Sequence, residues 1–217
     1  MNRFTVVAAM LVALASPAKA QTIYTETMFG DLSNTYTSPT TLFFLPGPAN
    51  TVSGTTGRSS TTGQIDFDIF TFNVPTGFVL SGIVPVSTTT PSLSFIAIDS
   101  GTSLSVDPAV VNSTFNPAGL LGYAHYGPAS FPPTIGTNIL AMMGTAAGAD
   151  GFTPPLGAGD YTIWLQETGT TPINYTFNFE ISAAIPEPET YALLAAGLLL
   201  LGYTAQRRRN SLARFAS

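Results

Sequence analysis

The 217-residue sequence contains no cysteine and only one histidine, His125. Without cysteine no disulfide can form, so a domain in an oxidising compartment must be stabilised by a packed core. One histidine and no cysteine also cannot build the usual tetrahedral zinc site. The region from residue 21 to 184 has about 164 residues, and chains of this size bury roughly 70% of their surface, which is enough for such a core.

Positive charge is scarce and confined mainly to the two ends of the chain. Between residues 21 and 184 the one Lys or Arg is Arg58, against ten carboxylates, so the formal charge of this region is 1 minus 10, or about −9. Nucleic acid and anionic lipid surfaces are disfavoured as partners, because both are bound by clustered cations. Neutral or cationic carbohydrate, divalent cations, or no ligand at all are the remaining possibilities.

The N-terminal apolar run, residues 4–15, is short for a transmembrane helix. Arg3 precedes this run, and the small residues Ala18 and Ala20 follow it. This pattern predicts a signal peptide over residues 1–20 that is cleaved before Gln21, rather than an N-terminal membrane anchor. Residues 21–184 are then expected outside the inner membrane.

The C-terminal apolar run, residues 190–205, is uncharged and is followed by Arg207, Arg208 and Arg209. Sixteen helical residues span about 24 Å, which is short against a hydrocarbon core of about 30 Å. Arginines resist crossing a membrane, so they are expected on the cytoplasmic side. The pattern predicts one short transmembrane helix, and Pro186, Glu187 and Pro188 precede it in an extended junction.

This order of Pro-Glu-Pro, apolar helix and arginine cluster resembles the PEP-CTERM sorting signal of exported bacterial proteins, also labelled the ice-binding protein C-terminal region. The resemblance covers about residues 185–210 and includes the sequence from Tyr191 to Leu198. In that family a membrane-embedded exosortase is thought to cut near Pro-Glu-Pro and move the protein outward, alongside exopolysaccharide production. The resemblance implies that residues 185–217 are a sorting and transient anchor segment and that an exosortase is a partner. The threonines of residues 21–184 have no fixed repeat, so ice binding is not inferred for that region.

Residues 21–184 show strand-like alternation punctuated by turns, with no sustained helical period. We predict an all-β, antiparallel β-sandwich, best defined over residues 64–182. The tract 53–63 is predicted as an exposed loop, and residues 108–150 as an insertion that is either a binding loop or a mobile excursion. The predicted strands are 41–45, 65–74, 78–84, 93–98, 135–142, 161–166 and 175–181. The predicted core contains Phe67, Ile69, Phe78, Leu80, Tyr161, Ile163 and Tyr175.

Three stretches of residues 64–181 resemble the bacterial pre-peptidase C-terminal domain, a small β-sandwich appended to secreted proteins. The resemblance implies the sandwich fold, and it implies little about function. The chain departs from the family at its middle strand, where Asp99 is the one aspartate, and through the long insertion. The similar stretches are 66–77, with Asp-x-Asp followed by Pro-Thr-Gly, 92–100, and 156–177, with Gly-Asp-Tyr and a final Tyr strand.

Catalytic chemistry has few candidate residues. His125 lies in a Gly- and Pro-rich stretch, and the sequence has no Gly-x-Ser-x-Gly elbow, so no catalytic residue and no cofactor are predicted. Asp66 and Asp68 share a strand face and could bind calcium or form an acid and base pair; the alternative is a solvated face. Trp164, between two apolar residues, either packs in the core or stacks on a sugar.

Three functions are compatible with the sequence. The leading hypothesis is a non-enzymatic exported protein of the cell surface or exopolysaccharide matrix, anchored transiently in the membrane. The second is a carbohydrate- or calcium-binding surface module. The third is a hydrolase, which would need His125 or a carboxylate pair lining a cleft.

Overall fold

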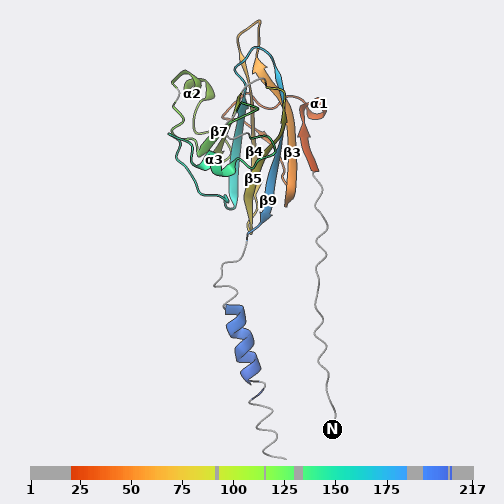
Figure 1. Cartoon of the computed structure of the whole chain (residues 1–217), viewed down its shortest axis with the longest axis vertical. Helices are drawn as coiled ribbons and strands as arrows, with labels where there is room; N and C mark the ends of the chain where they lie inside the picture. Colours follow the sequence, from red (N-terminus) through yellow and green to blue (C-terminus); the bar gives the residue numbers. More distant parts are fainter. Residues whose placement is uncertain are drawn as a thin grey trace, which may run out of the picture. The chain divides into compact units, whose positions relative to one another are not determined.

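In the computed structural model, the described residues are 21–90, 93–114, 116–129, 134–184, 193–204 and 206, without the side chains of residues 48 and 49. The chain divides into two compact units, Met1–Ser182 and Ala183–Ser217. The first unit is built mainly of strands (Figure 1). Its elements are β1 (Gln21–Thr25), α1 (Glu26–Phe29), β2 (Thr40–Thr41), β3 (Gly47–Arg58), β4 (Ile65–Val74), β5 (Phe78–Thr88), β6 (Ser94–Ser100), α2 (Pro108–Thr114), β7 (Gly122–Tyr126), α3 (Leu140–Gly144), β8 (Gly159–Gln166) and β9 (Ile173–Ala183).

The strands form one sheet in the order β5-β9-β3-β4-β8-β6-β7, and β1 and β2 add parallel to β3 and β4. The long pairs β3 with β9, β4 with β8, β6 with β8 and β6 with β7 are antiparallel. The sheet has two arms, one made of β5, β9 and β3 and the other of β4, β8, β6 and β7. Two residue pairs at the ends of β3 and β4 link these arms. The sheet is nearly closed and barrel-like, so the predicted all-β antiparallel class is confirmed, but the strands do not separate into two independent sheets.

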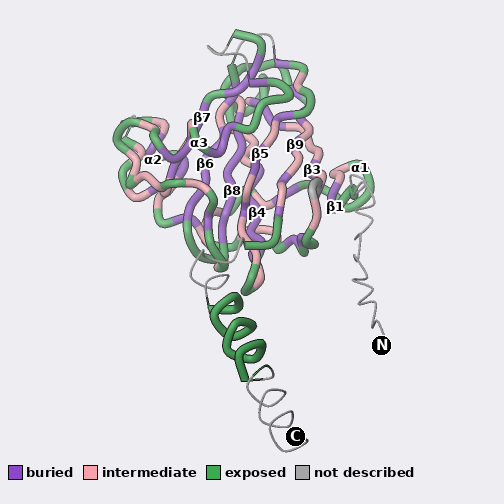
Figure 2. Tube along the Cα trace, turned by 60° about the horizontal axis from the view of Figure 1, so that its bottom comes forward, coloured by how far each residue is buried: buried purple, intermediate pink, exposed green. Residues whose placement is uncertain are grey.

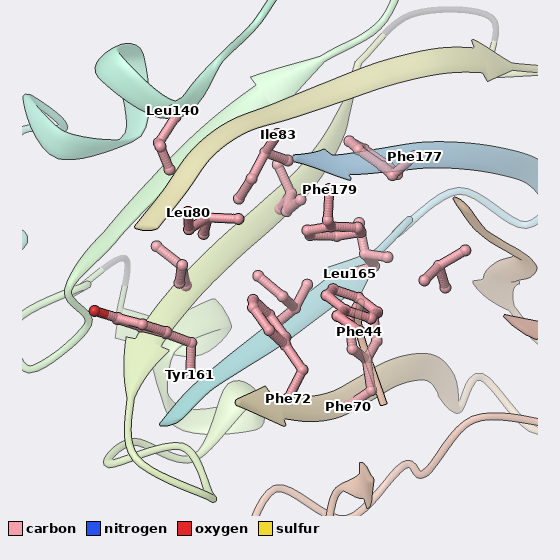
Figure 3. Close-up of a cluster of buried hydrophobic side chains, with 14 of the residues drawn as sticks. Phe44, Phe70, Phe72, Leu80, Ile83, Leu140, Tyr161, Leu165, Phe177 and Phe179 are labelled. Carbon is pink, nitrogen blue, oxygen red and sulfur yellow. The ribbon is translucent and has the colours of Figure 1, made fainter. Parts of the chain in front are cut away.

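The main core lies between the two arms of the sheet (Figure 3). In β9 the five odd-numbered residues from 173 to 181 are buried and the residues between them are more exposed, which is the period of two expected for a strand with one covered face. Aromatic rings from both arms meet: Phe179 of β9 contacts Phe70 at a centroid distance of 5.6 Å and Phe72 at 5.8 Å, both from β4. These contacts hold the two arms together.

A second apolar cluster covers the outer face of β4, β8 and β6. It joins Ile69, Ala97 and Trp164 to Leu104 and Val111, which belong to the segment that carries α2. The middle of β4 is therefore buried on both faces. Trp164 is fully buried, which confirms core packing over sugar stacking for this residue.

The predicted core is largely confirmed. The buried members are Ile69, Leu80, Tyr161, Ile163 and Tyr175. Phe67 and Phe78 are partly buried and pack at the margins of the two clusters.

The prediction of an exposed loop over residues 53–63 is wrong for its first half, since β3 continues to Arg58. The side chains of this part are polar, so the apolar alternation that signals a strand is missing. Hydroxyl and amide groups pair across the strands instead: Thr51 donates to Asn178 at 2.7 Å and Thr55 to Asn174 at 2.9 Å. Such cross-strand pairs stabilise a sheet as apolar pairs do.

The predicted strand at 135–142 is also wrong, because residues 140–144 form helix α3. Ile139, Leu140 and Met143 are buried, and their spacing of i, i+1 and i+4 is helical. The interpretation of residues 108–150 as an insertion outside the sheet is corrected too. Strand β7 lies in this stretch and pairs with β6.

The second unit contains a helix over residues 193–204, within the predicted segment 190–205, and its side chains are exposed (Figure 2). None of the helices in the described ranges is both long and apolar enough to cross a membrane. The other residues predicted for sorting and cleavage lie outside the described residues. They are Ala18, Ala20, Pro186, Glu187, Pro188, Arg207, Arg208 and Arg209.

Candidate functional site

A groove of about 360 Å³ lies on the outer face of the sheet, over β6, β7 and the end of β8. The register of the strands brings its side chains together, since Phe95 of β6 is paired with His125 of β7 on one side and with Gln166 of β8 on the other. Tyr123, two residues before His125, shares that face. The aromatic groove is defined by Phe95, Tyr123, His125, Asn112, Gln166 and Glu167.

Aromatic rings form the floor of the aromatic groove. Phe95 and Tyr123 stack with a centroid distance of 5.7 Å, and the His125 ring meets Phe95 edge-on at 5.6 Å. The buried Trp164 ring supports Phe95 from below at 4.8 Å. The Tyr123 hydroxyl donates to the carbonyl of Ala147 at 3.0 Å, which fixes the ring in place. The floor is therefore a supported aromatic surface.

Polar side chains form the rim, and each of them is hydrogen-bonded to another group of the protein. The amides of Asn112 and Gln166 bond reciprocally at 2.9 and 2.7 Å. Glu167 accepts hydrogen bonds from the Ser94 hydroxyl at 2.6 Å and from the Gly169 amide at 2.8 Å. Each amide still has a spare donor and acceptor site. The rim can thus bind hydroxyl groups without rearranging.

His125 lies in strand β7, so its predicted place in a Gly- and Pro-rich loop is wrong. The turn residues begin only after this strand, at Gly127. Burial lowers the pKa of His125 below its ordinary value of 6.5, which favours the neutral ring. Among the described residues, no hydrogen bond joins His125 to a serine or a carboxylate, so the arrangement of a catalytic triad is not formed there.

Asp66 and Asp68 do not converge on one site. Asp66 is half-buried at the start of β4 and accepts a hydrogen bond from Asn34 at 3.1 Å. Asp68 points into the domain and is fully buried, so the alternative of a solvated strand face is wrong for it. One carboxylate oxygen from each of Glu26, Asp31 and Asp68 lies within 4.8 Å of the other two. These three residues are the acidic cluster.

The environment of the acidic cluster disfavours negative charge. Burial and the neighbouring Glu26 carboxylate raise the pKa of Asp68 to about 9. Burial also raises the pKa of Glu26, although hydrogen bonds from the backbone amides of Thr55 and Leu32 oppose this. Three negative charges this close together require a proton or a cation among them.

Sequence reasoning missed most of both sites. Asn112 and Gln166 are far apart in the chain, and so are Glu26 and Asp68, so no local motif joins them. One signal was present: Gln166 and Glu167 end an apolar strand that has no other polar side chain after Thr162. Neither a scan against protein-family models nor a search of curated proteins found a match to this chain.

Proposed function

We propose that this chain is a non-enzymatic exported protein of the cell surface or exopolysaccharide matrix, and that the aromatic groove binds a neutral saccharide of that matrix. The signal-peptide pattern and the PEP-CTERM-like C-terminus support export, a transient membrane anchor and processing by an exosortase. The single observation that carries the binding proposal is the supported pair of rings, Phe95 and Tyr123, inside a polar rim.

The lining of the groove suits a sugar. A pyranose ring has an apolar face that packs on an aromatic ring, and it has equatorial hydroxyls that pair with amides and carboxylates. The volume of about 360 Å³ lies at the small end of ligand pockets, which run from about 300 to 1,000 Å³. Among the described residues of the lining, Glu167 is the one that carries a charge, so an anionic ligand would be repelled. A short neutral saccharide is therefore the best match.

The same lining argues against hydrolysis of that sugar. Most glycoside hydrolases need two carboxyl groups, one on each side of the scissile bond. The described lining of the aromatic groove contains one carboxylate, Glu167, and it is already held by hydrogen bonds. Binding without cleavage is the function that this arrangement supports.

A saccharide array tests the binding proposal. The full chain in detergent should bind neutral polysaccharides and change the fluorescence of Trp164, the one tryptophan, whose ring supports Phe95. Tyr123→Ala should weaken binding about threefold to tenfold, because a ring contact contributes about 0.5–1.5 kcal/mol. Phe43→Ala, at an 82% exposed ring outside the groove, is the matched control. Absence of saccharide binding by the folded protein would overturn the proposal.

A separate experiment tests export and processing. Replacing Pro186, Glu187 and Pro188 with alanine should let the helix extend outward and leave an uncut precursor in the membrane. Cell fractionation and mass spectrometry of the mature C-terminus measure this, and His125→Gln serves as a control that should not alter localisation. Surface-exposed wild-type protein with its tail intact through Ser217, in a host that has the exosortase, would contradict processing.

A further inference from the structure

The acidic cluster joins three separate parts of the fold. Glu26 opens α1, Asp31 follows that helix, and Asp68 lies in β4. One carboxylate oxygen from each lies within 4.8 Å of the other two. Glu26 and Asp31 also line a surface groove of about 760 Å³, which gives a hydrated ion a route from solvent.

Asp68 provides a second, independent observation. It is fully buried, and neither of its carboxylate oxygens makes a hydrogen bond of ordinary length and angle; the buried Tyr175 hydroxyl and the Glu26 carboxyl lie beside it. More than about 90% of buried polar groups in proteins are hydrogen-bonded, and an unpaired buried carboxylate is strongly unfavourable. These oxygens therefore need a partner that carries positive charge or a proton.

The protein itself does not supply that charge. Arg58 is the one Lys or Arg between residues 21 and 184. Its guanidinium donates to the carbonyls of Thr168 and Gly63. In the described residues no side-chain cation reaches Asp68, so either a proton or a cation from solution must offset its charge.

The backbone around the acidic cluster leaves space for the cluster's side chains to approach one another closely. Glu26 is held by a hydrogen bond of 2.7 Å from the Thr55 amide to its Oε2. A Cβ atom at Gly54 would lie 2.7 Å from Glu26 Oε1 and 2.4 Å from the Tyr175 hydroxyl. The glycine leaves room for both oxygens beside Asp68.

We propose that Glu26, Asp31 and Asp68 bind a calcium ion. Ca²⁺ takes six to eight oxygen ligands at about 2.3–2.6 Å, so two ligands across the ion lie up to about 5 Å apart, which accommodates the 4.8 Å limit of the cluster. Mg²⁺ demands a near-ideal octahedron with bonds of about 2.0–2.1 Å and usually keeps several waters. An irregular set of three carboxylates favours the larger ion.

Calcium at this position would fasten α1 to the sheet. No side chain of α1 is buried, and Met28 and Phe29 are 74% and 59% exposed. The segment of residues 26–31 is thus held by few apolar contacts of its own. A bound ion would connect it directly to β4 through Asp68.

Direct binding measurements test the proposal. The full chain in detergent, stripped with EDTA, should bind Tb³⁺ with emission sensitised by the nearby tyrosines, and Ca²⁺ should displace it. The expected dissociation constant for Ca²⁺ is about 10⁻⁴–10⁻³ M, the range of extracellular modules. Mg²⁺ should compete at least about tenfold less well. Calcium should also raise the melting temperature and slow proteolysis near α1.

Matched variants distinguish calcium binding at this site from nonspecific attraction of cations to the acidic surface. Asp31→Asn, at an exposed position, and Glu26→Gln should each lower the affinity for Ca²⁺ at least about tenfold. Asp150→Asn should bind as wild type does. Folded protein that shows no saturable binding up to about 10 mM Ca²⁺, tenfold above the weakest extracellular sites, would overturn the proposal. Unchanged affinity in both Asp31→Asn and Glu26→Gln, or tighter binding of Mg²⁺ than of Ca²⁺, would do so as well.

Discussion

The aromatic groove and the acidic cluster occupy opposite faces of the same sheet, and their polar groups differ in one respect. In the groove, the buried amide of Gln166 and the carboxylate of Glu167 both have hydrogen-bond partners. In the cluster, the buried carboxyl of Asp68 makes no hydrogen bond of ordinary geometry. The amides and the carboxylate of the rim are therefore paired without a ligand, whereas the carboxyl of Asp68 is not.

Because of this difference, ligand binding at the two sites is coupled to folding in different ways. A ligand in the aromatic groove would add its binding energy to a rim whose amides and carboxylate already have hydrogen-bond partners. A cation in the acidic cluster would replace the proton that Asp68 otherwise holds, so its binding and the stability of the fold are linked. The two sites should accordingly respond differently to pH, to mutation and to ligand removal.

The largest expected effect is the change in the free energy of unfolding with pH in the absence of calcium. Asp68 has a pKa of about 9 in the folded protein against an ordinary value of 3.8, so the folded state holds one more proton than the unfolded state between these values. Stability from this group is fully present below about pH 3.8 and falls as pH rises, by about 1.4 kcal/mol per unit. From pH 5 to pH 7 the free energy of unfolding should drop by about 3 kcal/mol.

Urea unfolding in EDTA at the two pH values measures this drop. Asp68→Asn should abolish most of it, because the amide has the same shape and does not titrate, and Asp150→Asn should leave it in place. Calcium should reduce the drop in the wild type, because it displaces the proton, binds the carboxylates and so adds stability at pH 7. A free energy of unfolding that rises from pH 5 to pH 7 in EDTA would show that Asp68 is not a source of instability.

A substitution at Gly54 should crowd the acidic cluster and leave the aromatic groove unchanged. Gly54→Ala places a Cβ against the Tyr175 hydroxyl and Glu26, and such overpacking costs about 1–3 kcal/mol. Calcium affinity should fall with it, while saccharide binding in the groove should not change. Gly157→Ala, where no atom lies within 4 Å of the added Cβ, is the control. Urea unfolding and Tb³⁺ titration measure the two effects, and a neutral Gly54→Ala would contradict the crowded geometry.

The amide pair of the aromatic groove should give a smaller effect. Asn112→Ala leaves the amide of Gln166, which is 5% exposed, without its partner. The expected loss is about 1 kcal/mol, at the low end for an unsatisfied buried group because Asn112 is only partly buried. The double variant Asn112→Ala with Gln166→Leu should recover stability. Urea unfolding of the wild type, of Asn112→Ala, of Gln166→Leu and of the double variant gives the coupling energy. Strict additivity would mean that the pair does not act as a unit.

The sequence predicts best where one face of a strand is apolar. In β9 the buried and exposed residues alternate as expected, and in β8 the apolar run marks a strand that is covered on both faces. The prediction fails where polar pairs replace apolar ones, as in β3, whose Thr51 and Thr55 bond across to β9. It fails also at α3, where a five-residue helix is too short to show a period.

The two sites are harder to predict than the fold, because each is assembled from distant segments. Asp68 was singled out by its spacing from Asp66, but its neighbours in space, Glu26 and Asp31, come from before β2. Their convergence depends on β1 adding in parallel beside β3. Nothing in the local sequence specifies that pairing, so the sequence could suggest a calcium ligand without identifying its partners.

The smallest expected effect comes from His125, and its sign is opposite to that of Asp68. Burial lowers the pKa of His125 in the folded protein below its ordinary value of 6.5, so the stability from the neutral ring is present above pH 6.5 and is lost as pH falls through the folded pKa. The side chain is partly exposed, and solvent screening should keep the loss well under 1 kcal/mol.

Nuclear magnetic resonance can follow this titration directly, because the protein has one histidine and hence one imidazole signal of this kind. The midpoint should lie below 6.5 in the folded protein. Unfolding of Asp68→Asn and of Asp68→Asn with His125→Gln at pH 5 and pH 7 isolates the histidine, because the raised pKa values of Glu26 and Asp66 are common to both. The protein that keeps His125 should be slightly less stable at pH 5, relative to pH 7, than the one that lacks it. A midpoint at or above 6.5 would mean that the ring is solvated or paired with a negative charge. It would then not be packed as a neutral part of the aromatic floor.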